Sequence, residues 1–213
     1  MVTIRYVNKN DIEYIKHILT IHDVFFKDYI SIILDKLILN KNIVSCLIAE
    51  SNGKQIGFDI NVLDMYNFWN TIYKNLNFIG KYKYIRDNKK DNNYNFNKPT
   101  SICNNVINNL YTPQNNIAYT LFYYNSQTNK NIKGFMLGII QMIILKNFRE
   151  GDFLYQSAEI KQDNILSIES YKQRGFNTTS FSYLPNGNIF AVINIKNIEE
   201  KLKTFKINAN ILY

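Results

Sequence analysis

Cysteine, proline and glycine are all scarce in this chain, whose 213 residues include 2 cysteines, 3 prolines and 8 glycines. The cysteines, Cys46 and Cys103, lack the CxxC spacing of a metal site, which indicates reduced thiols that bind no metal, as in a cytosolic protein. A hydrophobic run long enough to span a membrane is also missing, and "MVTIRYVNKN" at the N-terminus has no signal-peptide core. We therefore expect a cytoplasmic protein without a membrane partner.

The low glycine and proline contents accompany an abundance of Asn, Lys, Ile and Tyr, which is the composition that an A/T-rich coding sequence produces. Lysine is then partly a compositional default, so the formal net charge of +8 and the pI ≈ 9.3 do not by themselves establish a nucleic-acid partner. The charge still favours an anionic ligand. Hydrophobic residues make up 46% and charged residues 20%, which is typical of a soluble globular protein.

Apolar periodicity and turn residues predict an alternation of strands and helices. A strand at 3–7 precedes a helix at 8–19, which Asn10 caps with Glu13 as its return partner, and a second helix follows at 27–39. Two apolar strands form a hairpin around Asn52-Gly53, the strongest short-range turn signal. The later elements are predicted as a strand at 116–124, an apolar helix at 135–148, a strand at 152–160, a helix from 163 to 175 and a final hairpin turning at 185–187.

The segment 63–113 differs in composition from the rest of the chain. It begins with "MYNFWNTIYKNL", predicted as an aromatic helix, continues through a polar Asn/Lys-rich loop and ends with a short helix at 102–111. Its aromatic residues Tyr66, Trp69 and Tyr73 are candidates either for stacking on a ligand or for the core. Because the segment has too little apolar content for its own core, we expect an insertion within one domain spanning 1–213.

The most informative stretch is "DNILSIESYKQRGF", from Asp163 to Phe176. Asp163 or Asn164 can cap the first amides of a helix, and Gly175 can end it. Ile165, Ile168 and Tyr171 recur at three-residue spacing and are predicted to share a face. Asn164 and Tyr171 are seven residues apart, which brings them to nearly the same side.

This stretch resembles the signature N-x-x-[A/S]-I-x-x-Y-x-x-x-G-F of the GCN5-related N-acetyltransferase (GNAT) superfamily. The matching residues are Asn164, Ser167, Ile168, Tyr171, Gly175 and Phe176. A second family motif, [R/Q]-x-x-G-x-[G/A], aligns with Asn131, Gly134 and Met136, of which only the glycine is kept. The resemblance implies a GNAT fold, an α/β (α+β) architecture with a mixed, mostly antiparallel sheet of about seven strands flanked by helices. The insertion would then separate the third and fourth strands.

The resemblance also implies the roles of individual residues in binding acetyl-CoA. Phe122 and Tyr123 would lie where the fourth strand splays from the fifth and pairs with the pantetheine arm, which Asn164 would also bind. Tyr171 would act as the general acid that protonates the departing thiolate. The pyrophosphate would bind at the start of the 135–148 helix, where unpaired amides and the helix dipole favour anions; the residues concerned are Lys130, Asn131, Ile132, Lys133, Gly134, Phe135 and Met136.

A general base for the acceptor amine is harder to assign, because the fourth strand has no Asp, Glu or His between Ile117 and Tyr124. The candidates are Asp23, Asp28 and Asp59, together with a pair formed by His22 and Asp23. The predicted catalytic residues are Tyr171 and Asp28. "VFFKDYI" (24–30) faintly resembles the arylalkylamine N-acetyltransferases, although Tyr29 stands where that family has a glutamate.

The function that the resemblance implies is transfer of acetyl from acetyl-CoA, without a metal, to a primary amine of a small molecule. The acceptor would be an amino-sugar nucleotide, an arylalkylamine or a polyamine. One alternative is an acyltransferase that acts on a protein or aminoacyl-tRNA, with nucleic acid as a partner. Another is a catalytically inactive CoA-binding module. Either a monomer or a homodimer fits the sequence.

Overall fold

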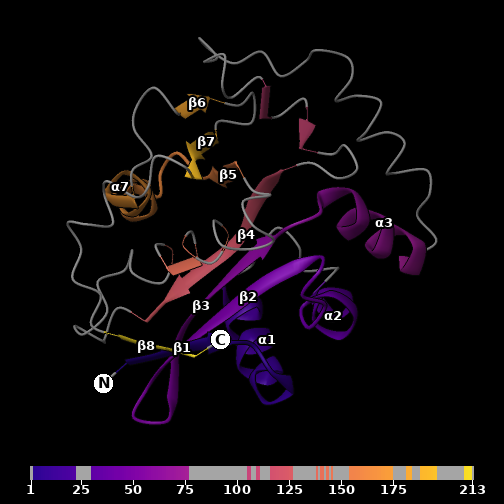
Figure 1. Cartoon of the computed structure of the whole chain (residues 1–213), viewed down its shortest axis with the longest axis vertical. Helices are drawn as coiled ribbons and strands as arrows, with labels where there is room; N and C mark the ends of the chain where they lie inside the picture. The colour runs from indigo at the N-terminus through magenta and orange to yellow at the C-terminus, as the bar shows by residue number, and fades with distance from the viewer. Residues whose placement is uncertain are drawn as a thin grey trace.

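The computed structural model describes a sheet of eight strands with helices on both of its faces (Figure 1). The described residues are 2–22, 30–76, 105–106, 109–110, 116–126, 138, 140–141, 143, 145, 154–174, 181–183, 188–195 and 209–212. The strands are β1 (Val2–Tyr6), β2 (Val44–Ser51), β3 (Lys54–Val62), β4 (Ile117–Asn125), β5 (Tyr155–Ile160), β6 (Phe181–Tyr183), β7 (Ile189–Asn194) and β8 (Ala209–Leu212). Their spatial order is β6-β7-β5-β4-β3-β2-β1-β8.

The expected mixed, mostly antiparallel sheet is confirmed. Among the described strands, β4–β5 and β1–β8 are the parallel pairs, and every other neighbouring pair is antiparallel. β1 to β7 are the strands that the sequence predicts, whereas β8 was not predicted. A four-residue edge strand gives too short a pattern to be distinguished from a loop.

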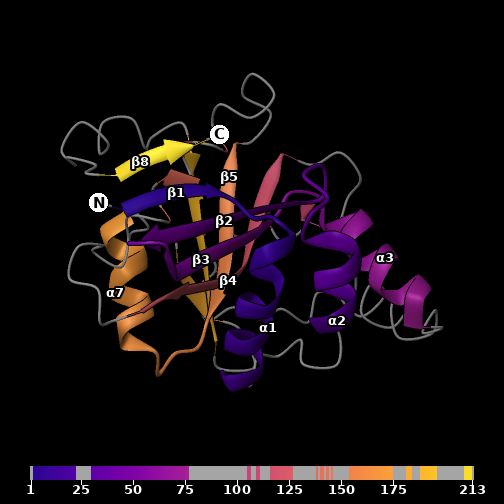
Figure 2. The same ribbon diagram turned by 90° about the horizontal axis from the view of Figure 1, so that it is seen from below.

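Buried hydrophobic residues of the described part form three clusters, and β7 shows how the two faces of the sheet are divided between two of them. Phe190 and Val192 pack into a core with residues of α1 (Ile12–Ile21), of the following helix and of α3 (Met65–Leu76). Ile189 and Ala191, which alternate with them, pack with residues of α7 (Ile165–Arg174) on the other face. Figure 2 shows α1, α2 and α3 grouped together and α7 standing apart from them.

The first helix begins with a capping box, but not at the predicted residues. Asn8 caps the 3₁₀ turn η1 (Lys9–Asp11): its side chain accepts a hydrogen bond from the Asn10 amide at 2.9 Å, and the Asn8 amide donates to Asp11 at 2.8 Å. The prediction of Asn10 and Glu13 was therefore wrong by two residues. The reason is tertiary, because the Asp11 carboxylate is fully buried beside Arg5 and is held at this position.

The predicted second helix is confirmed over its described part, although not as a regular helix. α2 (Ile30–Ile32) continues into the π-helical segment η3 (Ile33–Leu37). The Ile38 amide donates to the Ile33 carbonyl at 2.8 Å, which is the i→i+5 bond of a π-helix. Residues 27–29 of the predicted helix lie outside the described residues.

The predicted hairpin turn at Asn52-Gly53 is confirmed in detail. Both residues have positive φ, 51° at Asn52 and 73° at Gly53. Positive φ at both central positions is what a type I′ turn requires, and its twist matches that of the flanking strands. The turn sets the pairing of β2 with β3, in which Ser51 is opposite Lys54.

The predicted aromatic helix is α3, and it contributes to the main core. Phe68 and Ile72 are fully buried there with Val106 and Leu110, so the described parts of the 63–113 segment pack on the sheet. Trp69 is half-buried and meets the Phe68 ring edge-on at 5.6 Å between centroids. This packing favours the core role for Trp69 over ligand stacking. No helix among the described residues is long and apolar enough to cross a membrane.

Candidate active site

The distinctive feature of the sheet is the point at which β4 and β5 separate. Their parallel ladder runs from the pair Ile117↔Tyr155 to the pair Thr120↔Ala158. β4 then continues to Asn125 along β3, while β5 continues to Ile160 along β7. Among the described residues, β4 and β5 share no ladder pair beyond Thr120↔Ala158, and we call this position the branch point.

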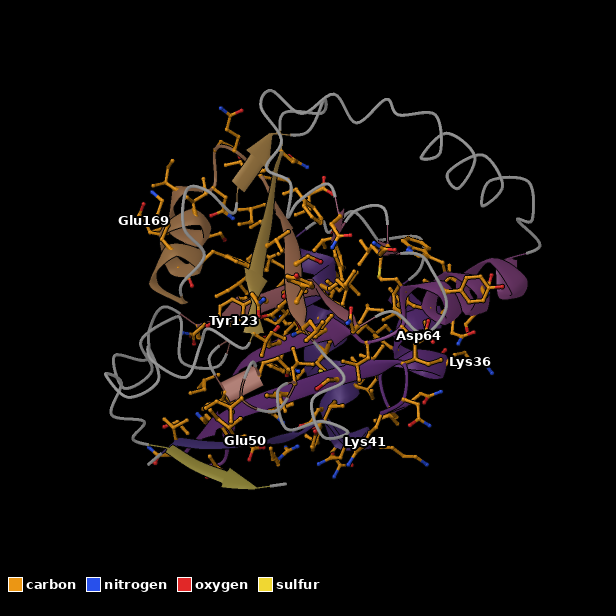
Figure 3. The ribbon with its side chains drawn as sticks, turned by 45° about the horizontal axis from the view of Figure 1, so that its top comes forward. Lys36, Lys41, Glu50, Asp64, Tyr123 and Glu169 are labelled. Atoms are coloured by element: carbon orange, nitrogen blue, oxygen red, sulfur yellow. The ribbon has the colours of Figure 1, made fainter. Side chains whose placement is uncertain are left out.

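A β-bulge lies at the branch point. On β4, Thr120 pairs with Asn61 and Phe122 pairs with Ile60, so Leu121 is an extra residue with no opposite residue on β3. The bulge changes which side chains face which core beyond it. Phe122 and Tyr124 consequently pack on the α1 side, whereas Tyr123 packs on the other face, against a third cluster that includes Ile4 and Ala49. Figure 3 shows Tyr123 over the middle of the sheet.

A buried polar network ties the strands together immediately before they separate. Asn61 Oδ1 accepts hydrogen bonds from Thr120 Oγ1 at 2.9 Å and from Gln156 Nε2 at 2.7 Å, which links β3, β4 and β5. Asn61 Nδ2 donates to Asp59 Oδ1 at 2.8 Å. Thr120 is 5% exposed, and the other network residues are fully buried. Because a buried polar group needs its partners, this network fixes the strand positions at the branch point.

α7 follows β5 and brings Tyr171 toward the branch point from the β5 side. Asn164 caps the helix, because its Oδ1 accepts from the Ser167 amide at 3.1 Å. Ile168 and Tyr171 pack with Ala158 and Ile160 of β5, and Tyr171 is 6% exposed. The predicted shared face is correct for this pair but wrong for Ile165, which is 62% exposed. Ile165 lies in the first turn, before the helix reaches the sheet.

An aromatic surface covers the α1 side of β4 beyond the branch point. The Phe58 ring of β3 stacks on Phe122 at 5.6 Å between centroids and lies 5.9 Å from Tyr124. Tyr14 of α1 meets Phe58 edge-on at 6.0 Å. Burial, together with the nearby Tyr124, raises the pKa of Tyr14 to about 12. Its phenol therefore stays protonated at neutral pH.

His22, at the C-terminal end of α1, completes this aromatic surface. Its ring centroid lies 5.3 Å from that of Tyr124 and 6.4 Å from that of Phe122. The His22 side chain is exposed, and the His22 backbone amide donates a hydrogen bond to the Ile18 carbonyl at 3.1 Å. The sequence names His22 as part of a candidate pair but gives no sign that it lies against β4.

Several predicted site residues lie outside the described residues: Asp23, Asp28 and the whole pyrophosphate segment Lys130, Asn131, Ile132, Lys133, Gly134, Phe135 and Met136. Asp59, another candidate base, is fully buried in the polar network. Phe122 and Tyr123 lie on β4 beyond the branch point, as predicted, but their side chains face opposite sides of the sheet.

The described residues offer neither a reactive thiol nor a metal site. Burial raises the pKa of the Cys46 thiol well above its usual range, and the carboxylates of Asp59 and Asp11 raise it further. This thiol is therefore a poor nucleophile. Within the described part of the chain, no group of three or more His, Cys, Asp or Glu side chains is arranged to hold a metal ion.

Solved acetyltransferase structures share this architecture. An aminoglycoside acetyltransferase, AAC(6')-Ib in complex with coenzyme A, superposes with a TM-score of 0.56 at 14% identity, over 95% of this chain and 99% of that chain. NAA60 of Arabidopsis thaliana in complex with acetyl-CoA gives a TM-score of 0.55 at 13% identity, over 92% of this chain and 99% of that chain. A Desulfovibrio desulfuricans protein assigned to the GNAT family gives a TM-score of 0.54 at 9% identity, over 92% and 99% of the two chains.

These similarities establish the fold: the chain has the architecture of the GNAT acetyltransferases, as the tyrosine-helix motif predicts. By sequence, no protein-family model and no curated protein matches it.

Proposed function

We propose that the protein is an acetyl-CoA-dependent N-acetyltransferase whose acceptor is the primary amine of a small molecule. The observation that carries this proposal is the branch point, where β4 leaves β5 with Tyr171 packed on the β5 side. In a sheet, an edge that stops pairing leaves backbone amides and carbonyls that an extended ligand can use as a partner strand would. The amides of a pantetheine arm suit this role.

The start of α7 offers additional contacts for the same arm. Ile165 and Leu166 are 62% and 71% exposed, an unusual exposure for large aliphatic side chains, and can pack on its methyl and methylene groups. The helix cap uses the Asn164 side-chain oxygen, so its NH₂ group can donate to an arm carbonyl. The basic residues Lys130 and Lys133 would neutralise the pyrophosphate.

The proposed chemistry is direct acyl transfer. The acceptor ammonium first loses a proton to a base, and the resulting amine nitrogen attacks the thioester carbonyl carbon. A C–N bond forms, the C–S bond breaks, and the Tyr171 hydroxyl donates its proton to the departing thiolate sulfur. The acylated nitrogen still carries two hydrogens and releases one of them to solvent, and the phenolate regains a proton from solvent. The products are an acetamide and free CoA.

The aromatic surface on the α1 side of β4 supports a small acceptor. Phe122, Tyr124 and the exposed His22 present ring faces beside the branch point, and such faces attract ammonium groups and stack on flat rings. A protein of similar fold, the aminoglycoside acetyltransferase AAC(6')-Ib, has been solved with coenzyme A and kanamycin, with a TM-score of 0.52 and 14% identity to this chain.

The decisive experiment is a thioester-cleavage assay with acetyl-CoA and a panel of amines. The panel should contain arylalkylamines, polyamines, amino sugars with their nucleotide derivatives, a peptide with a free N-terminus and an aminoacyl-tRNA. We expect CoA release and an acetylated product with a member of the first three classes. Turnover of only the peptide or the tRNA would show that the acceptor is a macromolecule and not a small molecule. Acetyl-CoA binding without turnover of any amine would indicate an inactive CoA-binding module.

A further inference from the structure

The proposed reaction leaves one role open, because neither β4 nor the buried network supplies an accessible base. Asp59 is fully buried, and its Oδ1 accepts from Asn61. It also alternates with Phe58 and Ile60, which face α1, and so it points to the other side of the sheet. A base for an amine must lie within hydrogen-bond reach of that amine or of a water beside it.

His22 lies beside β4 beyond the branch point and is exposed. Its imidazole contacts the rings of Tyr124 and Phe122, which are on β4 beyond the branch point and on the α1 side. Tyr171 packs on β5 from the other face of the sheet. An amine that approaches the branch point over the aromatic surface therefore meets the imidazole, while the sulfur would depart on the side of Tyr171.

We propose that His22 is the general base of this acetyltransferase and removes the proton from the acceptor ammonium, directly or through one water. This inference rests on the proposed function. The ammonium proton passes to an imidazole nitrogen, and the amine lone pair then attacks the thioester as described above. Because His22 is exposed, the imidazolium returns its proton to solvent before the next turnover. Histidine is the residue type best suited to this exchange near neutral pH.

The neighbouring groups leave this role to the imidazole. The titratable side chain in ring contact with His22, among the described residues, is that of Tyr124 on β4. Tyr14 faces Tyr124 from α1, and its pKa, raised to about 12 by burial and Tyr124, keeps that phenol protonated. The other charged or titratable side chains of α1, those of Glu13, Lys16 and His17, are exposed. The aromatic faces next to His22 also favour a cationic acceptor.

The sequence supplies a matched control, because the chain has 2 histidines and the other, His17, is exposed on the same helix. We would compare His22→Gln with His17→Gln in kcat/KM for the best amine from pH 5.5 to 9.5. In His22→Gln we expect a loss of about 10²–10⁴-fold at neutral pH and disappearance of the limb on which the rate rises with pH. His17→Gln should retain the wild-type profile, and both variants should retain the acetyl-CoA-induced rise in melting temperature.

A second measurement does not depend on turnover. With only two histidines, the imidazole C–H signals can be assigned from the two variants, and the acceptor amine should shift the His22 signal without moving that of His17. An active wild type whose pH profile survives in His22→Gln would overturn the base assignment and leave the acetyltransferase proposal intact. Equal losses in both variants would overturn it as well. A wild type inactive with every amine would overturn the proposed function and, with it, this role for His22.

Discussion

Arg5 and Asp11 show how single residues set the start of the first helix. Arg5 donates to both carboxylate oxygens of Asp11, at 2.7 and 2.8 Å, and also contacts Glu50. Burial alone would raise the pKa of Asp11, but the hydrogen bonds from Arg5, the Asn8 amide and Gln55 outweigh it and lower the pKa. The carboxylate therefore stays ionised while it fixes both β1 and the capping box.

A pH prediction follows from this lowered pKa. A carboxyl group whose pKa is lower in the folded than in the unfolded state stabilises the protein above its unfolded pKa, about 4. That stabilisation is lost as the pH falls through the folded value. Asp11→Asn should lower the unfolding free energy at pH 7 by about 3 kcal/mol, because it leaves Arg5 without its main partner. Between pH 5 and pH 2 the unfolding free energy of the Asp11→Asn variant should also fall less than that of the wild type. Urea titrations at each pH measure this difference. Parallel pH curves for the two proteins would contradict this account.

A substitution at Tyr171 tests its proposed role as the general acid. Tyr171→Phe removes one hydroxyl and keeps the ring that packs against Ala158 and Ile160, so stability and acetyl-CoA affinity should stay near wild type. Single-turnover rates should fall by up to about 10²–10⁴-fold if thiolate departure limits the reaction. Wild-type single-turnover rates at several pH values would make Tyr171 a packing residue only.

The structure of β4 depends on the strands that it pairs with as much as on its own sequence. Its existence was predictable from an apolar, aromatic run, and the hairpin of β2 and β3 was predictable from Asn52-Gly53. The bulge at Leu121 was not predictable, because Leu121 lacks an opposite residue only through the register in which β4 pairs with β3. The position of His22 against Phe122 was hidden for the same reason, since helix-to-strand contacts depend on the assembled sheet.

Gly57 of β3 offers a way to disturb β4 beyond the branch point without substituting any residue of β4. A Cβ atom at Gly57 would lie 2.7 Å from the Tyr124 carbonyl oxygen and 3.3 Å from the Asn125 Cα, so β4 would have to shift. Gly57→Ala should weaken acetyl-CoA binding, measured by calorimetry, and lower stability by about 1–3 kcal/mol.

Gly53→Ala is the matched control for this effect. Gly53 has a φ of 73° but nothing within 4 Å of a built Cβ, so its substitution strains the turn and leaves β4 in place. We expect a loss of about 1 kcal/mol of stability with wild-type acetyl-CoA affinity per folded molecule. If both variants bind acetyl-CoA equally well, the position of β4 does not control cofactor binding.

The molecule as a whole carries the charge that should favour a polyanionic cosubstrate. Acetyl-CoA should raise the melting temperature, because at about 100-fold above its Kd it stabilises the native state by about 2.7 kcal/mol. Reversing both Lys130 and Lys133 to glutamate should shrink this rise. Lys36 and Lys41 are exposed and lie away from α7 (Figure 3). Reversing both of them to glutamate changes the net charge equally but should leave the rise in melting temperature unchanged. Equal effects of the two double variants would reveal a general field rather than a pyrophosphate site at 130–136.

The sequence motif predicted the fold class because it combines local signals that need no knowledge of distant contacts. Asn164 as a cap and the shared face of Ile168 and Tyr171 are both read from neighbouring residues. The buried network of Asn61, Thr120 and Gln156 joins three strands distant in sequence, and no spacing rule reveals it.

The parallel pair β1–β8 has a consequence for how the chain reaches this structure. Val2 pairs with Ala209, so the two strands come from opposite ends of the sequence. Closing so long a loop carries a large entropy cost, and contacts of this kind form late and slow the search for the native state. β1 pairs with β2 after closure of a far shorter loop, as in the pair Ile4↔Ala49. β1 can therefore be in place before β8 pairs with it. The β8 amides should therefore gain protection from hydrogen exchange last during refolding and lose it first as the native protein begins to open.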